Sequence, residues 1–154
     1  MSKQVGAQIG VIENVSYVFQ SGETNIEHKQ GQVILYDFWA TWCPPCQAPM
    51  AHNQEMLAHN KSSWGDKVRI VGLSLDQDLN KLKQHITNKG WTDVEHYLAS
   101  NGQCTADQDF EVQGIPHIVL VDTSGKIVFK GHPGHRKNLE GDINALLAGQ
   151  GIQQ

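Results

Sequence analysis

Hydrophobic residues form two long, nearly continuous runs in this chain, with shorter runs around them. From Val33 to Trp39 almost every position is aliphatic, β-branched or aromatic, without alternation between apolar and polar residues. Such a run is typical of a central strand that is covered on both faces. Residues 68–75 repeat the pattern. The sequence therefore predicts two buried strands.

Apolar residues at spacings of three and four predict helices elsewhere in the chain. Met50, Asn53 and Leu57 follow Cys46 on one face of a helix that we expect from residue 43 to about residue 59. Gly90 stands at the end of a second amphipathic segment, where glycine commonly terminates a helix. The predicted helices span residues 43–59, 78–89, 105–112 and 139–149, and the third carries Ala106 and Phe110 inward.

Short strands and turns complete the pattern. A turn at residues 122–125 separates two short apolar segments, which predicts an antiparallel hairpin. Asn14 separates two short runs that suggest one or two edge strands. The short strands are predicted at 9–13, 16–19, 94–99, 118–121 and 126–129, with polar turns or loops at 28–31 and 61–66 and a frayed end at 150–154. This order predicts the α/β class, with a mixed sheet and helices on both faces.

Length, composition and charge narrow the possibilities. The 154 residues, 39% of them hydrophobic, are sufficient for a core and predict one domain over residues 1–154. A net charge of −4, with both signs interspersed, argues against nucleic acid or a membrane surface as a partner. Residues 1–10 lack the apolar block of a signal peptide. We therefore expect a cytoplasmic protein, the alternative being an extracytoplasmic mature domain whose signal or anchor has been removed.

Two cysteines separated by two prolines, Cys43-Pro44-Pro45-Cys46, follow the first buried run. Three cysteines are too few for a secreted disulfide scaffold, so the pair indicates a redox or metal site. A helix that begins at Cys43 offers its first amides and its positive dipole end to this sulfur, which favours the thiolate. Cys43 is thus the expected nucleophile, and Cys46 the thiol that resolves a mixed disulfide.

The two prolines bear on the reduction potential of this pair. Pro44 and Pro45 have no N–H, so the amide of Cys46 is the main donor left for the Cys43 sulfur, besides the amide of Cys43 itself. Stabilisation of the thiolate should then be modest. This predicts a potential nearer the reducing end, and hence a reductase.

Three other positions carry candidate chemistry. Asp37 interrupts the apolar run, where burial would raise its pKa and allow it to act as general base for Cys46; the alternative is an aspartate at a strand end that faces water. Trp42 is expected either as an exposed contact surface or as an ordinary core aromatic. Gly114-Ile115-Pro116 places a proline at a strand start, either as a cis-proline or as a turn proline without a role.

The segment from Asp37 to Cys46 resembles the active-site segment of the thioredoxin superfamily, and Gly114-Ile115-Pro116 resembles the cis-proline loop of that family. The resemblance covers residues 33–147 and implies a thioredoxin fold, a central mixed sheet flanked by helices on both faces. Residues 76–113 exceed the length found in a minimal thioredoxin, which implies an extra helix and strand before the cis-proline loop. Residues 1–30 would form a short N-terminal β extension. These features resemble the TlpA/ResA-type or the nucleoredoxin- and tryparedoxin-like branches.

The resemblance also implies an activity, thiol-disulfide exchange with protein substrates, and a set of site residues. Cys43 and Cys46 would react, and Asp37 would be the buried acid. His117 replaces the threonine common after the cis-proline and either adds pH-dependent charge or is a strand-start histidine with a backbone partner. The expected partners are protein disulfides and an upstream thiol or disulfide donor, with no cofactor beyond the Cys43–Cys46 disulfide, and the chain is expected to be a monomer. The implied substrate contacts are Trp42, Pro44, Pro45, Ile115, Pro116 and His117, with Ile115 acting through its backbone.

Other function classes remain open from the sequence. A redox-gated module that binds proteins without turnover and a peroxidase of thioredoxin fold are the main alternatives. A zinc site would need further ligands beside Cys43 and Cys46, and no metal site is expected. His132 and His135 flank Pro-Gly, which we interpret as a loop without helical presentation. Cys104 is expected to be a partly buried free thiol, the alternative being a regulatory disulfide.

Overall fold

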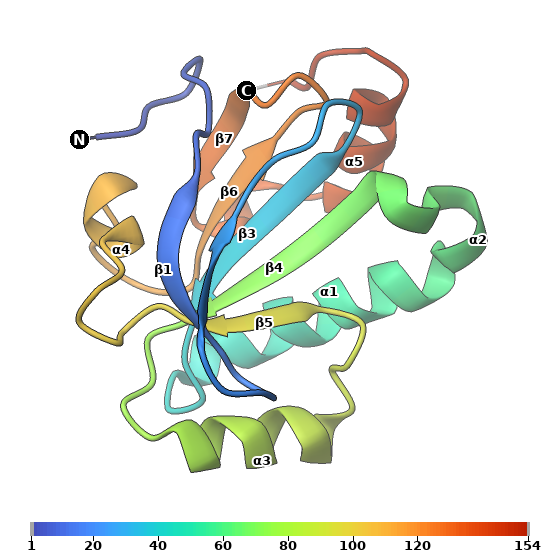
Figure 1. Ribbon diagram of the computed structural model, residues 1–154. Coiled ribbons are helices and arrows are strands. Elements are labelled where there is room, and N and C mark those ends of the chain that lie inside the picture. Colours follow the sequence, from blue (N-terminus) through green and yellow to red (C-terminus); the bar gives the residue numbers. More distant parts are fainter. Residues whose placement is uncertain (1, 154) are drawn as a thin grey trace.

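A computed structural model describes residues 2–153 and contains one seven-stranded mixed sheet in the order β2-β1-β5-β4-β3-β6-β7 (Figure 1). The strands are β1 Ile12–Tyr17, β2 Glu23–Ile26, β3 Val33–Trp39, β4 Val68–Ser74, β5 Glu95–Leu98, β6 His117–Val121 and β7 Ile127–Gly131. The helices are α1 Gln47–His59, α2 Lys61–Trp64, α3 Leu79–Lys89, α4 Ala106–Asp109 and α5 Leu139–Leu147. Three short 3₁₀ helices are η1 Pro44–Cys46, η2 Gly65–Lys67 and η3 Pro133–His135.

The strand β3 lies inside the sheet, as its apolar run predicted. It pairs in parallel with β4 and antiparallel with β6, and all seven of its side chains are buried. Asp37 stands opposite Gly72 on one side and Ile118 on the other. The carboxyl ends of β3 and β4 therefore meet at the edge of the sheet where the chain continues into the cysteine segment.

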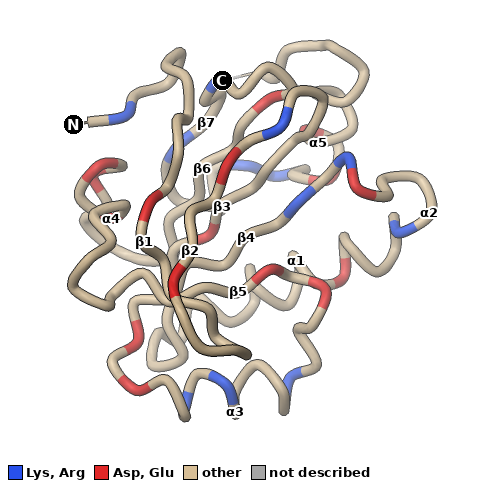
Figure 2. Tube along the Cα trace, viewed as in Figure 1, with Lys and Arg blue, Asp and Glu red and all other residues tan. Residues whose placement is uncertain are grey.

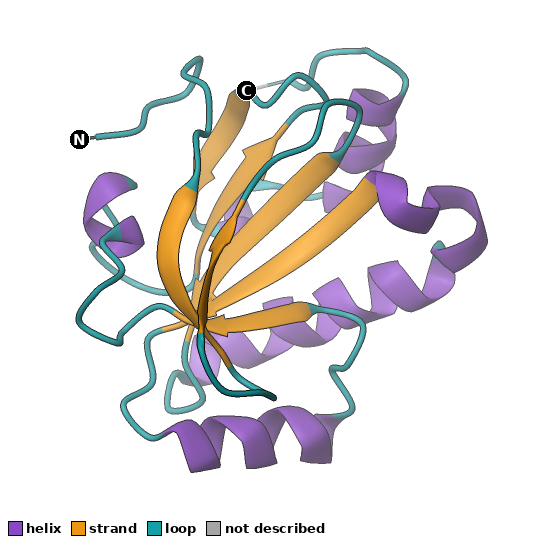
Figure 3. Ribbon diagram, viewed as in Figure 1, coloured by secondary structure: helices purple, strands orange, loops and turns teal. Residues whose placement is uncertain are grey.

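The two faces of the sheet carry separate hydrophobic clusters. Leu35 and Trp39 of β3 pack with residues of α1, α3 and α5 on one face. Tyr36 and Phe38 pack with the N-terminal segment and with α4 on the other. Figures 1 and 3 show α1 and α5 behind the sheet, with α4 beside β1 on the opposite side. The predicted α/β fold with helices on both faces is confirmed. We call the first face the α1 face and the second the α4 face.

The N-terminal β extension is also confirmed, but its details differ from the prediction. A single strand β1 runs through Asn14, which adopts a left-handed φ of 62° at an irregularity in the register with β2. Asparagine tolerates this conformation better than most residues, so the break inferred at Asn14 is a bulge within one strand. The second strand, β2, lies over residues 23–26, where no strand was predicted.

Residues 61–66 were predicted as a loop, and this is wrong. Lys61–Trp64 forms a short helix that continues into η2. Trp64 is buried, and its indole N–H donates a 2.8 Å hydrogen bond to Oδ1 of Asn144 in α5. Tertiary packing of this aromatic therefore organises a segment whose own composition is polar.

The remaining elements follow the prediction closely. The hairpin of β6 and β7, the strand β5 and the helices α3 and α5 lie where the pattern placed them, whereas α4 is shorter than residues 105–112. Basic and acidic residues are interspersed along the described chain (Figure 2). None of the helices between residues 2 and 153 combines the length and hydropathy needed to cross a lipid bilayer.

Candidate active site

Cys43 and Cys46 are joined by a disulfide at the start of the helical segment that follows β3. The S–S distance is 2.19 Å, and the two Cα atoms lie 5.4 Å apart. Cys43 precedes η1, which passes directly into α1, so the helix predicted from residue 43 begins with a 3₁₀ turn. Cys43 is 5% exposed, and Cys46 is fully buried. A thiol from another molecule can therefore reach the sulfur of Cys43 more readily than that of Cys46.

The backbone amides of both cysteines already have carbonyl partners. The amide of Cys43 donates to the carbonyl of Ala40 at 3.2 Å, and that of Cys46 donates to the carbonyl of Cys43 at 3.1 Å. The Cys46 amide was predicted as the main donor for the Cys43 sulfur, and the structure assigns it to the 3₁₀ turn instead. A Cys43 thiolate therefore has even fewer backbone amide donors than we predicted from the sequence.

The loop before β6 lies against the disulfide. The Ile115–Pro116 peptide bond is cis, as one of the two sequence interpretations required. The carbonyl oxygen of Ile115 is 3.7 Å from the sulfur of Cys43. Residues 72 positions apart in the sequence are thus brought together. This places the backbone of the cis-proline loop beside the sulfur that a substrate would approach.

The surface around Cys43 is formed by exposed apolar side chains. Trp42 is 64% exposed, and Pro44 and Pro45 are also exposed. The interpretation of Trp42 as an ordinary core aromatic is wrong, whereas Trp39 is fully buried as expected. An exposed apolar surface next to a reactive sulfur suits contact with another protein. The substrate-binding roles of these residues stay predictions.

Asp37 is fully buried on the α1 face, so the interpretation that it faces water is wrong. Asn53 of α1 donates a 2.8 Å hydrogen bond to its Oδ2, while Oδ1 has no hydrogen-bond partner within residues 2–153. Burial raises the pKa of Asp37 to about 7, and the hydrogen bond from Asn53 partly opposes this rise. A carboxyl group with this pKa can take up and release a proton near neutral pH.

A cavity of about 270 Å³ opens beside Asp37. Asn53, Pro49 and Ile118 form part of its wall, and His52 and His132 also line it. Both histidines are exposed, so the cavity extends from the buried carboxyl towards the surface. Proton exchange between Asp37 and solvent has a route along this cavity.

Asp76 is a buried carboxylate that sequence reasoning missed. It follows β4 and accepts hydrogen bonds from the amide of Thr41 at 3.1 Å and from the Thr41 hydroxyl at 2.5 Å. The hydroxyl of Ser74 donates to the same carboxylate at 2.6 Å. Asp76 therefore fixes the loop two residues before Cys43. The only sequence signal was an acidic residue directly after a buried strand.

His117 begins β6, and its side chain lies on the α4 face. Its ring meets that of Phe38 edge to face, with centroids 6.1 Å apart. Burial and the nearby charge of Lys130 lower its pKa, and Nε2 has no hydrogen-bond partner in the described chain. The two cysteines pack in the cluster on the opposite face. The predicted functional role of His117 stays a prediction, tested below.

The other singled-out cysteine and histidines lie apart from the disulfide. Cys104 is a buried free thiol on the α4 face, and burial raises its pKa. Pro133–His135 forms the 3₁₀ helix η3, and the rings of His132 and His135 lie 6.1 Å apart, so the interpretation that Pro-Gly prevents helical presentation of the two histidines is wrong. Within residues 2–153 no three histidine, cysteine or acidic side chains gather as metal ligands.

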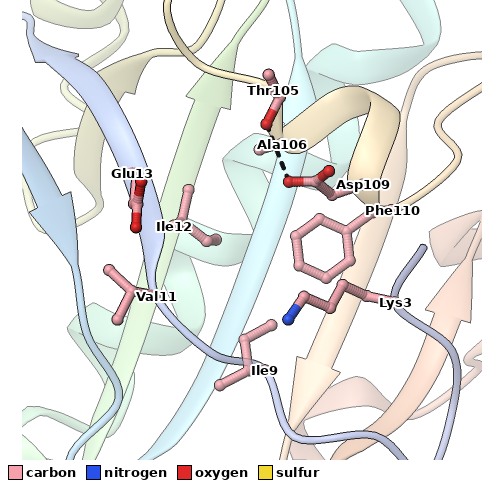
Figure 4. A pocket seen from close by; sticks show the side chains of 9 residues that line it. All are labelled: Lys3, Ile9, Val11, Ile12, Glu13, Thr105, Ala106, Asp109 and Phe110. Atoms are coloured by element: carbon pink, nitrogen blue, oxygen red, sulfur yellow. Dashed lines mark hydrogen bonds between the residues drawn. The ribbon is translucent and has the colours of Figure 1, made fainter. Parts of the chain in front are cut away.

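A second cavity, of about 320 Å³, lies on the α4 face between the N-terminal segment and α4. Figure 4 shows the side chain of Lys3 extending towards Ile9, close to the ring of Phe110. The hydroxyl of Thr105 donates to Asp109 at 3.1 Å on the same rim. None of the site residues predicted from the sequence lines this cavity.

Comparison with known proteins agrees with this geometry. DsbE, a thiol:disulfide interchange protein of Yersinia pestis, is 31% identical over 108 residues, which cover 69% of this chain and 51% of that protein. The thiol-disulfide oxidoreductase ResA of Oceanobacillus iheyensis is 32% identical over 65 residues, or 42% of this chain and 32% of ResA. The chain spans about half the length of the DsbE relatives that it matches.

A solved structure has the same fold over nearly the whole chain. It is a Chlorobium tepidum protein described as a candidate thiol:disulfide interchange protein DsbE, with a TM-score of 0.75, 23% identity, and coverage of 95% of this chain and 99% of that one. The profile of the thioredoxin-like family matches residues 31–127, which include the disulfide and the cis-proline. The chain therefore belongs to the thioredoxin-like family.

Proposed function

We propose that this protein is a thiol-disulfide oxidoreductase that reduces disulfides of protein substrates through Cys43 and Cys46. The observation that carries the proposal is the disulfide between Cys43, which is 5% exposed, and the fully buried Cys46, beside the exposed Trp42 and the Ile115 backbone. The names of the DsbE and ResA relatives support the same chemistry.

The reaction begins with the reduced pair. The thiolate of Cys43 attacks one sulfur of a substrate disulfide, which forms a mixed disulfide and releases the first substrate thiolate. Cys46 then loses its proton, and its thiolate attacks the sulfur of Cys43. This step forms the Cys43–Cys46 disulfide and releases the second substrate thiolate. The substrate gains two electrons and two protons, and the pair loses them.

Asp37 is proposed as the proton acceptor for Cys46. The carboxyl lies under α1, whose first residues follow Cys46, and Asn53 holds one of its oxygens. With a pKa of about 7 it can accept a proton from the resolving thiol and pass it to solvent along the cavity beside it. Asp37→Asn should then slow resolution of the mixed disulfide by on the order of 10²-fold at pH 7.

The substrate would lie against the exposed apolar surface. Trp42, Pro44 and Pro45 offer contact area, and the backbone of Ile115 would pair with an extended substrate segment next to the cis bond to Pro116. An upstream thiol donor would return the disulfide to the dithiol. We propose no cofactor beyond this redox-active disulfide and a monomer as the working form.

Location in the cell is part of the proposal. The cytoplasm is our proposed compartment, with an extracytoplasmic mature domain as the alternative. Fractionation of cells that carry the full-length gene with a C-terminal tag distinguishes the two.

Insulin reduction with dithiothreitol as donor tests the proposed activity. Wild type should accelerate insulin precipitation, whereas Cys43→Ser should not. Cys46→Ser should accumulate a mixed disulfide between Cys43 and insulin, detected by mass spectrometry. Wild type that captures partners without turnover would favour a redox-gated binding module, and turnover with hydrogen peroxide but not insulin would favour a peroxidase.

A further inference from the structure

Gln47, the first residue of α1, links the cysteine loop to α3. Its Nε2 donates to the carbonyl oxygen of Cys43 at 2.9 Å and lies 3.4 Å from the carbonyl oxygens of Ala40 and Thr41. Its Oε1 lies 2.7 Å from Nε2 of His85. One side-chain amide thus meets three carbonyls of the loop that carries Cys43, and a histidine holds its other end.

The hydrogen bonds of Gln47 fix its orientation and the tautomer of His85. Carbonyl oxygens only accept hydrogen bonds, so the NH₂ group of Gln47 must face them and Oε1 must face His85. Nε2 of His85 is then the donor. The ring of His85 packs against both Trp39 and Trp91, with centroid distances of 6.0 and 5.5 Å, and the two tryptophans lie 5.8 Å from each other. Gln47 is therefore held in one orientation by a packed neighbour.

The charge surroundings of His85 favour its neutral form. Burial lowers its pKa, and Lys89 on the same helix lowers it further, while Asp76 acts in the opposite direction. A neutral His85 with its proton on Nε2 supplies the hydrogen bond to Gln47 without adding a positive charge to the loop. The link therefore persists at neutral pH.

The loop carbonyls would otherwise oppose a negative charge on Cys43. The amides of Cys43 and Cys46 already bond to carbonyls, and the carbonyl of Ile115 lies 3.7 Å from the Cys43 sulfur. Partial negative charges near a thiolate raise its energy. The NH₂ group of Gln47 offsets three of these carbonyl dipoles, so it stabilises the reduced, ionised pair more than the disulfide.

We propose that Gln47, held by His85, is a positioning residue that stabilises the thiolate of Cys43 and so raises the reduction potential of the Cys43–Cys46 pair. The inference rests on the proposed function, in which this pair cycles between dithiol and disulfide. It also gives the region 76–113 a role at the site, because His85 belongs to α3, inside that region.

Alkylation of reduced protein by iodoacetamide, followed at Cys43 by mass spectrometry across pH, tests the proposal. Gln47→Leu should move the midpoint of the alkylation profile to higher pH by about 0.5–1 unit, because the carbonyl of Cys43 loses its 2.9 Å donor and those of Ala40 and Thr41 lose the amide 3.4 Å away. Gln47→Glu preserves size but replaces the donor with a carboxylate, so it should move the midpoint further. His85→Phe keeps an aromatic ring against the two tryptophans but removes the donor to Gln47, and it should produce a smaller shift in the same direction.

The equilibrium with glutathione at pH 8 gives the second readout. Gln47→Leu should favour the disulfide about three- to tenfold more than wild type, which corresponds to about 15–30 mV towards more reducing potentials. Gln54→Leu is the matched control. Gln54 lies on the same helix and bonds Asp93 through both ends of its amide, at 2.6 and 2.9 Å, outside the cysteine loop. This variant should leave both readouts unchanged.

Three outcomes would overturn the inference: a Gln47→Leu profile that coincides with wild type, a shift to lower pH, or an equal shift in Gln54→Leu. If Gln47→Leu does not fold, Gln47→Glu and His85→Phe decide by the same criteria. Neither readout uses a protein substrate. Wild type that is inactive on insulin would therefore contradict the proposed function alone, and the shifts would still test Gln47.

Discussion

Asn53 of α1 donates a 2.8 Å hydrogen bond to Asp37 of β3, so a buried carboxyl group is held under the helix that follows the disulfide. Only one oxygen of Asp37 has a partner within the described chain. A single neutral donor offsets little of the cost of burying a carboxylate. This environment therefore favours protonation of Asp37. The ionised form of Asp37 lowers the stability of the folded protein.

Asp37→Asn should increase stability at alkaline pH. The pKa of Asp37 rises from 3.8 to about 7 on folding, so the folded state binds more protons than the unfolded state between these values. The stability of wild type should then decrease as pH rises from about 4 to about 7, and the variant should lack this decrease. Urea unfolding at pH 5 and pH 8.5 should show the variant more stable by up to about 4 kcal/mol at the higher pH.

Asn53→Leu separates burial from hydrogen bonding in this prediction. It removes the donor that favours the carboxylate, so the pKa of Asp37 should rise further and stability at pH 8.5 should decrease. Equal stability of wild type and Asp37→Asn at both pH values would contradict the argument.

Asp76→Ala should destabilise the protein and disturb the cysteine loop. The substitution leaves the partly buried amide and hydroxyl of Thr41 and the buried hydroxyl of Ser74 without their acceptor. The expected loss is about 2–4 kcal/mol in urea unfolding, with insulin reduction impaired even where the protein is folded. Asp78→Ala removes only the N-cap of α3 and should cost about 1 kcal/mol, with activity retained. Similar effects of the two substitutions on activity would contradict a specific role for Asp76.

The sequence predicts those parts of the site whose residues are neighbours in the chain. The run from Val33 to Trp39 and the two cysteines after it are contiguous, so their strand and helix junction follow from pattern alone. Asp76 and Thr41 are 35 residues apart, and Gln47 and His85 are 38 apart. Polar pairs at such separations leave no periodicity, because they depend on how strands and helices are arranged in space.

Two fold errors have different origins. Trp64 is buried and bonds to Asn144, which lies 80 residues away in the sequence. This contact stabilises a helix in a polar segment that we predicted as a loop. Asn14 adopts a left-handed conformation inside β1, so the strand continues where the sequence suggested a break. Tertiary packing overrides local propensity at Trp64, whereas at Asn14 the tolerance of asparagine for a left-handed φ lets the strand continue through a bulge.

His117→Thr should leave the reactivity of Cys43 unchanged above pH 7. The histidine lies against Phe38 on the α4 face, and its lowered pKa means that it is neutral in this range. A neutral ring on the opposite face has little electrostatic effect on the sulfur. Alkylation profiles of Cys43 for wild type and His117→Thr should therefore superimpose. A displaced midpoint in the variant would instead assign His117 to the mechanism.

Cys104 should react with iodoacetamide far more slowly than Cys43 in reduced, folded protein. Its side chain is buried on the α4 face, and burial raises its pKa, so both access and thiolate fraction are low. At pH 8 we expect mass spectrometry to detect alkylation of Cys43 first, with Cys104 modified at least about 10²-fold more slowly. In urea the two rates should converge, since the packing is then lost. Rapid modification of Cys104 in the folded protein, or a mixed disulfide with glutathione at that position, would favour the regulatory alternative over a structural thiol.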